Sequence, residues 1–121
     1  MEVKTIKKNG QGIAIIHSDK LLITDVQSAL DFMMTIQYET GCNRIVLPKS
    51  AIVEDFFNLK TKLLGEILQK FITYDVKLAI VGDFCGYTSK SLKAFIYECN
   101  NGKEIFFLPD EELALEKLSM S

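Results

Sequence analysis

The chain has 121 residues, of which 48% are hydrophobic and 25% are charged, and its formal net charge at pH 7 is −2. This length and apolar content predict a single domain with one core over residues 1–121. The nearly balanced charge leaves no basic face of the size that DNA or RNA binding requires, and no apolar run could cross a bilayer, so neither nucleic acid nor a membrane is an expected partner.

The first forty residues predict a hairpin and then a helix. Val3 to Lys8 and Gly12 to Ser18 are rich in β-forming residues, and Asn9-Gly10-Gln11-Gly12 between them accepts positive φ. Thr24-Asp25-Val26-Gln27 fits a capping box. The helix that follows is expected to end near Gly41 and to share one apolar face among Val26, Ala29, Leu30, Met33 and Ile36.

The middle of the chain predicts two strands around a long helix. Arg44 to Leu47 is a short apolar strand, and Val76 to Val81 is a continuous apolar run, typical of a central strand covered on both faces. Between them, apolar residues recur at helical spacing and predict one amphipathic helix. They are Phe56, Phe57, Leu59, Leu63, Leu64, Ile67, Leu68, Phe71 and Ile72.

The last third predicts a helix, a strand and a closing helix. Leu92, Phe95, Ile96 and Cys99 mark one helical face, and Asn101-Gly102 is suited to a left-handed cap. Glu104 to Leu108 is the last strand, and Asp110 can cap a helix that buries Leu113, Leu115 and Leu118. The order β-β-α-β-α-β-α-β-α predicts an α/β domain with a mixed sheet of about five strands and about four helices, mainly on one face.

This order of elements resembles the STAS or anti-sigma-factor-antagonist (SpoIIAA-like) fold over nearly the whole chain. The segments EDFFNLKTKLLGEILQKF, YDVKLAIVGDF, YTSKSLKAFIYE and EIFFLPDEELALEKL resemble an uncharacterised bacterial family, domain of unknown function 4180 (DUF4180), which implies no activity. The STAS resemblance implies a signalling module, in which an Asp-Ser-Ser or Asp-Ser-Thr signature at the second helix carries a phosphorylated serine. The corresponding segment, Val53 to Thr61, has no serine, and neither Ser50 nor Thr61 matches the signature, so we expect no such switch.

The stretch VGDFCGYTSKSLKAFI, from Val81 to Ile96, is the first candidate site. Its glycines and the later Lys-Ser pair lack the spacing of a Walker phosphate loop. Two interpretations stay open: a capped turn, or a weak small-molecule or anion site at the start of the helix that uses Thr88, Ser89 and Lys90. Asp83 leads the ligand-binding candidates, because ligands of open α/β sheets favour the carboxyl ends of strands.

The cysteines and the histidine predict neither a cofactor nor a metal site. Cys42, Cys85 and Cys99 form no C-x-x-C pair, and His17 is the sole histidine. A helix N-terminus after Cys85 could favour its thiolate, but no base is identifiable beside it, so we assign no catalytic residue.

The polar first residues lack the apolar segment of a secretory signal, and we expect a cytoplasmic protein.

A second candidate surface surrounds the adjacent aromatics Phe56 and Phe57. Two neighbouring residues cannot both face one helical stripe, so one of them could be exposed and anchor an interface, or the pair could bridge helix and loop inside the domain. The first hypothesis is a non-enzymatic regulatory module that binds a protein partner; the alternative is a small-molecule or anion-binding protein, or an enzyme, with its site near Asp83. A homodimer that covers an edge strand is a further expectation. The predicted partner-binding residues are Asp55, Phe57, Asn58, Lys60 and Thr61.

Overall fold

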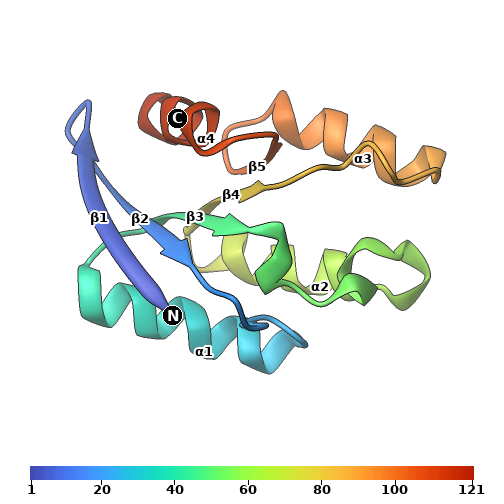
Figure 1. Ribbon diagram of the computed structural model, residues 1–121, viewed down its shortest axis with the longest axis horizontal. Coiled ribbons are helices and arrows are strands. Elements are labelled where there is room, and N and C mark those ends of the chain that lie inside the picture. Colours follow the sequence, from blue (N-terminus) through green and yellow to red (C-terminus); the bar gives the residue numbers. More distant parts are fainter.

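The computed structural model describes all 121 residues, and its five strands form one sheet in the order β1-β2-β3-β4-β5 (Figure 1). β1 (Glu2–Lys8) pairs antiparallel with β2 (Gln11–His17). β3 (Arg44–Pro48), β4 (Lys77–Val81) and β5 (Ile105–Leu108) follow in parallel. The predicted α/β class, mixed sheet and element order are confirmed.

The hairpin turn is shorter than predicted. Asn9 and Gly10 have φ of 53° and 78°, and Lys8 pairs directly with Gln11. Two residues with positive φ close a turn whose twist matches that of the strands, so no longer loop is needed. Gln11, which was expected in the loop, therefore belongs to β2, which begins one residue before the predicted start at Gly12.

Four helices cover the sheet: α1 (Val26–Thr40), α2 (Leu63–Thr73), α3 (Lys90–Asn100) and α4 (Glu111–Met120). Crossovers between parallel strands are right-handed, and each crossover here moves one strand further in the same direction, so α1, α2 and α3 share one face. Their buried side chains form the larger core cluster with Ala14, Ile45 and Phe107. α4 packs Ala114 and Leu118 on the opposite face (Figure 1), so the helices lie mainly on one face, as predicted.

Two helix ends differ from the prediction in detail. α1 is capped by Asp25, whose carboxylate accepts a hydrogen bond from the Ser28 backbone N–H at 2.7 Å, one residue later than the predicted box. The end of α3 uses no left-handed residue: Asn101 has φ of −87° in the right-handed helical region, and Gly102 has no positive φ. The predicted left-handed cap is wrong, because α3 ends in a tight turn in which Gly102 donates to the Cys99 carbonyl.

The long helix predicted from Phe56 is wrong over its first part. The segment forms three short 3₁₀ turns, Lys49–Ala51, Glu54–Phe57 and Leu59–Thr61, and α2 begins only at Leu63. The Thr61 hydroxyl donates to the carbonyl oxygens of Asp55 and Asn58, both at 2.8 Å. Such side-chain hydrogen bonds compete with helical pairing, and Lys62, with φ of 63°, breaks the helical path.

A buried arginine on β3 holds the C-terminal helix, α4, to the sheet. Arg44 on β3 donates through Nε to the Leu118 carbonyl and through Nη2 to the Ser121 carbonyl, both at 2.9 Å. These contacts satisfy carbonyl groups that the end of a helix leaves unpaired. Leu118 is buried as predicted, whereas Leu113 is exposed, because the helix turns Ala114 toward the sheet instead.

The two edges of the sheet are treated differently. At the β5 edge, the Asn100 side chain accepts from the Phe107 N–H at 2.7 Å and donates to its carbonyl at 3.0 Å, so its amide takes the place of a neighbouring strand. The β1 edge has no such cover and carries lysines at three of its seven positions, which guard an open edge.

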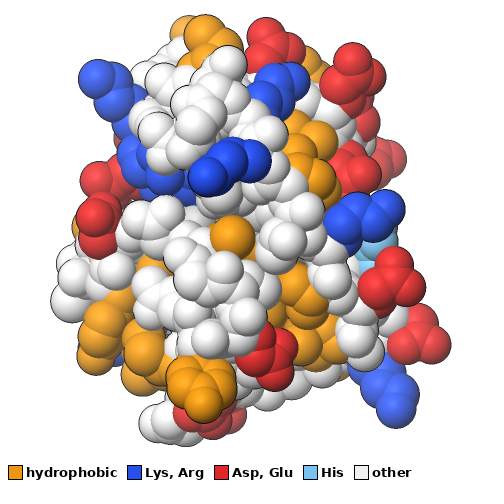
Figure 2. Space-filling view, turned by 90° about the vertical axis from the view of Figure 1, so that its left-hand side faces the viewer, with side chains coloured by type: hydrophobic (Ala, Val, Ile, Leu, Met, Phe, Trp, Pro, Cys, Tyr) orange, Lys and Arg blue, Asp and Glu red, His pale blue; other side chains and the backbone are white.

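Figure 2 views the end of the molecule that bears the hairpin, where charged side chains of both signs stand out around a largely uncharged surface.

No helix combines the length and the apolar character that crossing a membrane would require.

Candidate functional site

The loops that follow β3 and β4 meet at the carboxyl ends of the strands and pack on one another through aromatic rings. Phe57 stacks on Tyr87 with ring centroids 5.3 Å apart, and it also contacts Phe56 at 4.9 Å and Phe84 at 5.9 Å. Phe56 and Phe57 are 1% and 4% exposed, so neither stands out from the surface. The two are buried together because the loop after β4 covers Phe57, which fits the interpretation that the pair bridges elements inside the domain.

Lys49 and Glu54 complete the junction between these loops. The Lys49 Nζ lies 4.9 Å from the centre of the Tyr87 ring and 5.5 Å from that of Phe57, within the range of cation–π attraction. The Tyr87 hydroxyl donates to Glu54 Oε1 at 2.8 Å. Burial of the phenol, with the hydrogen bond to the Glu54 carboxylate, raises the pKa of Tyr87 well above its usual value, so the tyrosine stays a donor.

At Gly82 the loop after β4 lies close against Lys49 of the loop after β3. A Cβ atom built on Gly82 would lie 2.6 Å from the Lys49 Cβ, which is too close and involves an atom fixed to the backbone. We therefore expect Gly82→Ala to lower the free energy of unfolding by about 1–3 kcal/mol, measured by urea denaturation. Gly86→Ala, in the same loop and with no atom within 4 Å of its Cβ, is the matched control and is expected to be nearly neutral. Equal stability of the two variants would contradict this packing.

A groove runs between the two loops and is called the loop groove below. It encloses about 400 Å³, and its apolar lining residues are buried or half-buried, whereas its polar and charged lining residues are exposed and form the rim. Of the predicted partner-binding residues it contains all but Thr61, and of the predicted ligand-binding residues it contains Thr88 and Ser89. The structure thus brings residues of two separately predicted sites to one groove. Its lining residues are Glu54, Asp55, Phe57, Asn58, Leu59, Lys60, Tyr87, Thr88, Ser89 and Leu92.

Several of the predicted residues hold the loops in place with their polar atoms. Asn58 accepts from the Lys60 N–H at 3.1 Å, and Ser89 caps α3 by accepting from the Leu92 N–H at 3.2 Å, so the capped-turn interpretation holds for Ser89. Thr61 is occupied with backbone carbonyls, as described above. Lys90 is the first residue of α3, is exposed and lines no hollow.

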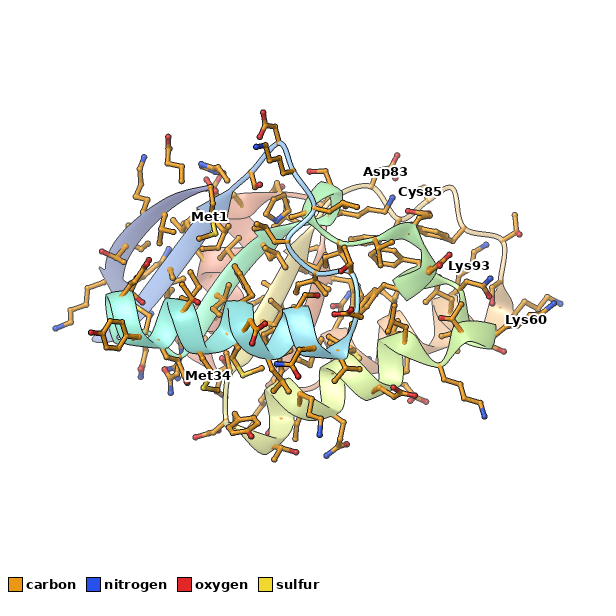
Figure 3. The ribbon with its side chains drawn as sticks, turned by 90° about the horizontal axis from the view of Figure 1, so that it is seen from below. Met1, Met34, Lys60, Asp83, Cys85 and Lys93 are labelled. Carbon is orange, nitrogen blue, oxygen red and sulfur yellow. The ribbon has the colours of Figure 1, made fainter.

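Three exposed side chains on the rim have free polar ends. The two ion pairs of the structure both involve His17, so the Asp55 carboxylate and the Lys60 ammonium are unpaired. The Thr88 hydroxyl makes no hydrogen bond to the protein either. Figure 3 shows Lys60 extending from the outer end of the turns before α2. The rim therefore offers a negative group, a positive group and a hydroxyl, all available to a partner.

Asp83 lies outside the loop groove, on a ridge between two further hollows at the strand ends. Figure 3 shows Asp83 and Cys85 close together on the loop after β4. Asp83 Oδ1 accepts from the Cys85 N–H at 2.9 Å, and hydrogen bonding from Cys85, aided by the charge of Lys49, lowers the pKa of the carboxyl. The structure does not bring Asp83 into one hollow with Thr88, Ser89 and Lys90.

The first of the two hollows, of about 580 Å³, lies at the ends of β3 and β4. The second, of about 460 Å³, lies at the ends of β4 and β5 and is called the β4–β5 crevice below. The first is lined by Leu21, Pro48, Lys49, Ser50, Ile52, Glu54, Val81, Gly82 and Asp83. The crevice is lined by Gly82, Asp83, Phe84, Cys85, Phe107 and Pro109.

Sequence reasoning missed the roles of Lys49, Glu54 and Tyr87. A signal for Lys49 was present, because it follows directly on a strand whose carboxyl end points to the edge where ligands of open α/β sheets bind. No local pattern could connect Glu54 with Tyr87, since the two residues are 33 positions apart.

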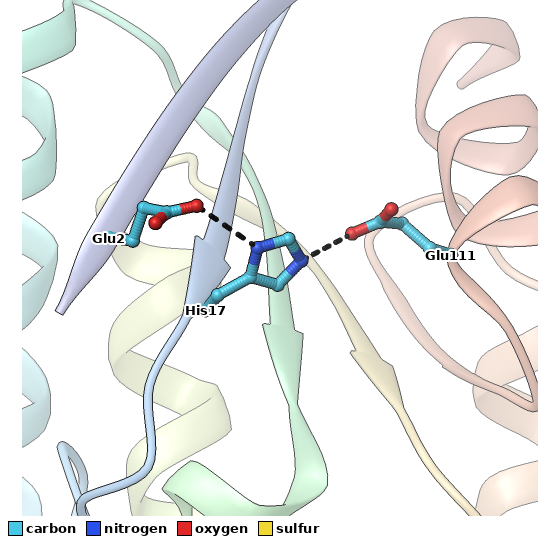
Figure 4. A network of polar contacts seen from close by, with 3 residues as sticks. All are labelled: Glu2, His17 and Glu111. Carbon is cyan, nitrogen blue, oxygen red and sulfur yellow. Dashed lines mark hydrogen bonds and ion pairs between the residues drawn. The ribbon is translucent and has the colours of Figure 1, made fainter.

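His17 lies at the end of β2 and contacts carboxylates. Its Nε2 is 3.0 Å from Glu111 Oε1 at the start of α4, and its Nδ1 is 3.8 Å from Glu2 Oε1 on β1 (Figure 4). The histidine thus links the first strand to the last helix.

Cys85 is exposed, and no three His, Cys, Asp or Glu side chains are grouped so that they could hold a metal ion.

Comparison with solved structures finds a crystal structure of a candidate anti-sigma factor antagonist from Thermotoga maritima. It is 14% identical, with a TM-score of 0.49, and the match covers 97% of this chain and 92% of that chain. No curated protein matches the chain.

A family model matches residues 8–118, nearly the whole chain, and its description is a domain of unknown function, DUF4180. The resemblance of the segments quoted from the sequence is confirmed. The protein belongs to the DUF4180 family.

Proposed function

We propose that the protein is a non-enzymatic regulatory module that binds a protein partner at the loop groove. The observation that carries this proposal is the contrast between the walls of the groove and its rim. The walls are fixed by the stack of Phe57 on Tyr87 and by Lys49 above both rings, so little ordering remains for binding to impose. The rim holds Asp55, Lys60 and Thr88 with their polar ends free.

The chemistry of the groove defines the partner segment. An apolar side chain of the partner would rest on Leu59 and Tyr87, the half-buried apolar residues of the lining. A basic residue on one side of that anchor would face Asp55, and an acidic residue on the other side would face Lys60. A buried anchor with a polar, charge-matched rim is the usual composition of specific protein interfaces.

Reversing the charge of Lys60 tests this surface. Lys60 is exposed and its ammonium makes no hydrogen bond or ion pair, so we expect Lys60→Glu to leave the melting temperature unchanged and to reduce partner capture about five- to tenfold. The measurement is quantitative affinity capture from a lysate of the source organism, with mass spectrometry. Lys7→Glu is the matched control, because it makes the same charge change on the exposed β1 edge, away from the groove. It should capture the partner as well as the wild type does.

The decisive experiment is a charge swap in the partner, the protein that the wild type captures and that Lys60→Glu fails to capture. Changing the acidic residue of its binding segment to lysine should restore binding to Lys60→Glu. Equal capture by Lys60→Glu and Lys7→Glu would overturn the proposed surface.

A second candidate function is small-molecule binding at the strand ends beside Asp83. It is supported by the two hollows on either side of Asp83 and by their place at the carboxyl ends of parallel strands.

A further inference from the structure

The path of the chain sets the β4–β5 crevice apart from the other hollows. The connections after β2, β3 and β4 all turn to the face that carries α1, α2 and α3, whereas the chain leaves β5 for α4 on the opposite face. In open α/β sheets, a crevice opens where two adjacent connections turn to opposite faces. In this sheet, that condition is met only between β4 and β5.

The walls of the crevice are flat and apolar. Phe84 and Phe107 pack edge to face, with ring centroids 5.5 Å apart and an angle of 83° between the planes. Phe107 is 3% exposed and is anchored further by Phe95, at 6.4 Å, so its ring is fixed. Pro109 supplies a third rigid surface. The volume of about 460 Å³ falls within the range of small-molecule sites.

The charge of the crevice has one sign. Asp83 is its single charged lining residue, and only Oδ1 of its carboxylate is hydrogen-bonded, to the Cys85 N–H. Lys49, the nearby cation, lines the other hollow and lies over the rings of Tyr87 and Phe57. No cationic side chain lines the crevice, so an acidic ligand would find no ion-pair partner among its lining residues, whereas a cation would find the Asp83 carboxylate.

We propose that the β4–β5 crevice binds a small organic cation with a flat apolar body, of the class of aromatic amines. The flat body lies against Phe84, Phe107 and Pro109, and the ammonium group donates to the free oxygen of Asp83. This inference rests on the second candidate function and names its ligand class. It is independent of the loop groove, whose lining shares no residue with the crevice.

Three compounds with one aromatic body test the proposal: tryptamine as the cation, tryptophol as the neutral analogue and indole-3-propionate as the anion. Each is titrated into the ¹⁵N-labelled protein and followed by backbone NMR. Tryptamine should shift the amides of Gly82, Asp83, Phe84, Cys85 and Phe107, and it should bind about fivefold more tightly than tryptophol, the contribution of one ion pair near the surface.

Asp83→Asn is the matching variant, because an asparagine oxygen can still accept from the Cys85 N–H and keep the turn. It should lose the preference for tryptamine over tryptophol, while Asp75→Asn, before the other end of β4, should keep it. Equal binding of all three compounds, or tighter binding of the anion at the same amides, would overturn the cation class and leave small-molecule binding standing. Absence of saturable shifts with any of the three would overturn the inference and would leave the second candidate function only the hollow at the ends of β3 and β4.

Discussion

Replacing Phe57 with alanine is expected to lower the free energy of unfolding by about 3–5 kcal/mol, the usual cost of removing a buried phenylalanine ring. The ring is 4% exposed and touches Phe56, Phe84 and Tyr87, so its loss leaves a cavity where the two loops join. Chemical denaturation followed by circular dichroism measures the change. Phe57→Leu fills most of the volume and should cost less than half as much. A loss below about 1 kcal/mol for Phe57→Ala would show that the loops do not depend on this ring.

This expectation changes how the partner surface has to be tested. The sequence leaves open whether Phe57 is an exposed anchor of an interface or a buried bridge between helix and loop. Because it is buried, Phe57→Ala would lose partner capture through instability as well as through any lost contact. Lys60→Glu separates the two effects, since the Lys60 side chain is exposed and its ammonium makes no hydrogen bond or ion pair in the folded protein.

Replacing Arg44 with methionine is expected to cost about 2–4 kcal/mol, because the buried hydrogen bond to the Leu118 carbonyl and the part-buried one to the Ser121 carbonyl both come from a charged group and are both lost. Methionine retains the apolar stem but removes the guanidinium donors, so that the Leu118 carbonyl keeps only the Ser121 hydroxyl, at 3.2 Å, and the Ser121 carbonyl loses its side-chain donor. Thermal unfolding gives the size of the effect, and hydrogen exchange should show the loss of protection concentrated in α4.

Lys77→Met is the control for this variant. Lys77 is the cross-strand neighbour of Arg44 on β4, and its ammonium makes one exposed hydrogen bond, to the Lys103 carbonyl at 3.0 Å. We expect a change below about 1 kcal/mol for Lys77→Met, since the group is exposed to water. If α4 kept its full protection in Arg44→Met, the arginine would not be what holds the helix.

The order of the elements could be predicted because the strands and helices bury residues at their own periods. The continuous apolar runs of β3 and β4 and the spaced apolar residues of α1 identified these elements correctly. The segment from residue 49 to residue 62 could not be predicted in this way. Its aromatic and leucine residues have helical spacing, but the hydroxyl of Thr61 and the positive φ of Lys62 decide its shape, and neither leaves a periodic signal.

The candidate site was predictable only in part. The strand ends and the exposed turns pointed to Asp83 and to the region of Asp55 and Lys60, because polar residues that follow buried strands gather at one edge of a sheet. The sequence could not reveal that Asp83 and Thr88 face different hollows. That separation depends on how Tyr87 between them turns toward Phe57, a contact between distant loops.

The side-chain amide of Asn100 limits how copies of the protein can associate through the edges of their sheets. A sheet with two open edges can add strands at both ends and so lengthen without limit, which is the route to ribbons and fibres. Here the side chain of Asn100 already fills the hydrogen-bonding positions of Phe107, so β5 offers no start for an added strand at that residue. Strand addition at β1 would therefore end after a single step: two copies joined there would each present a blocked edge outward, and the assembly would be closed at a pair.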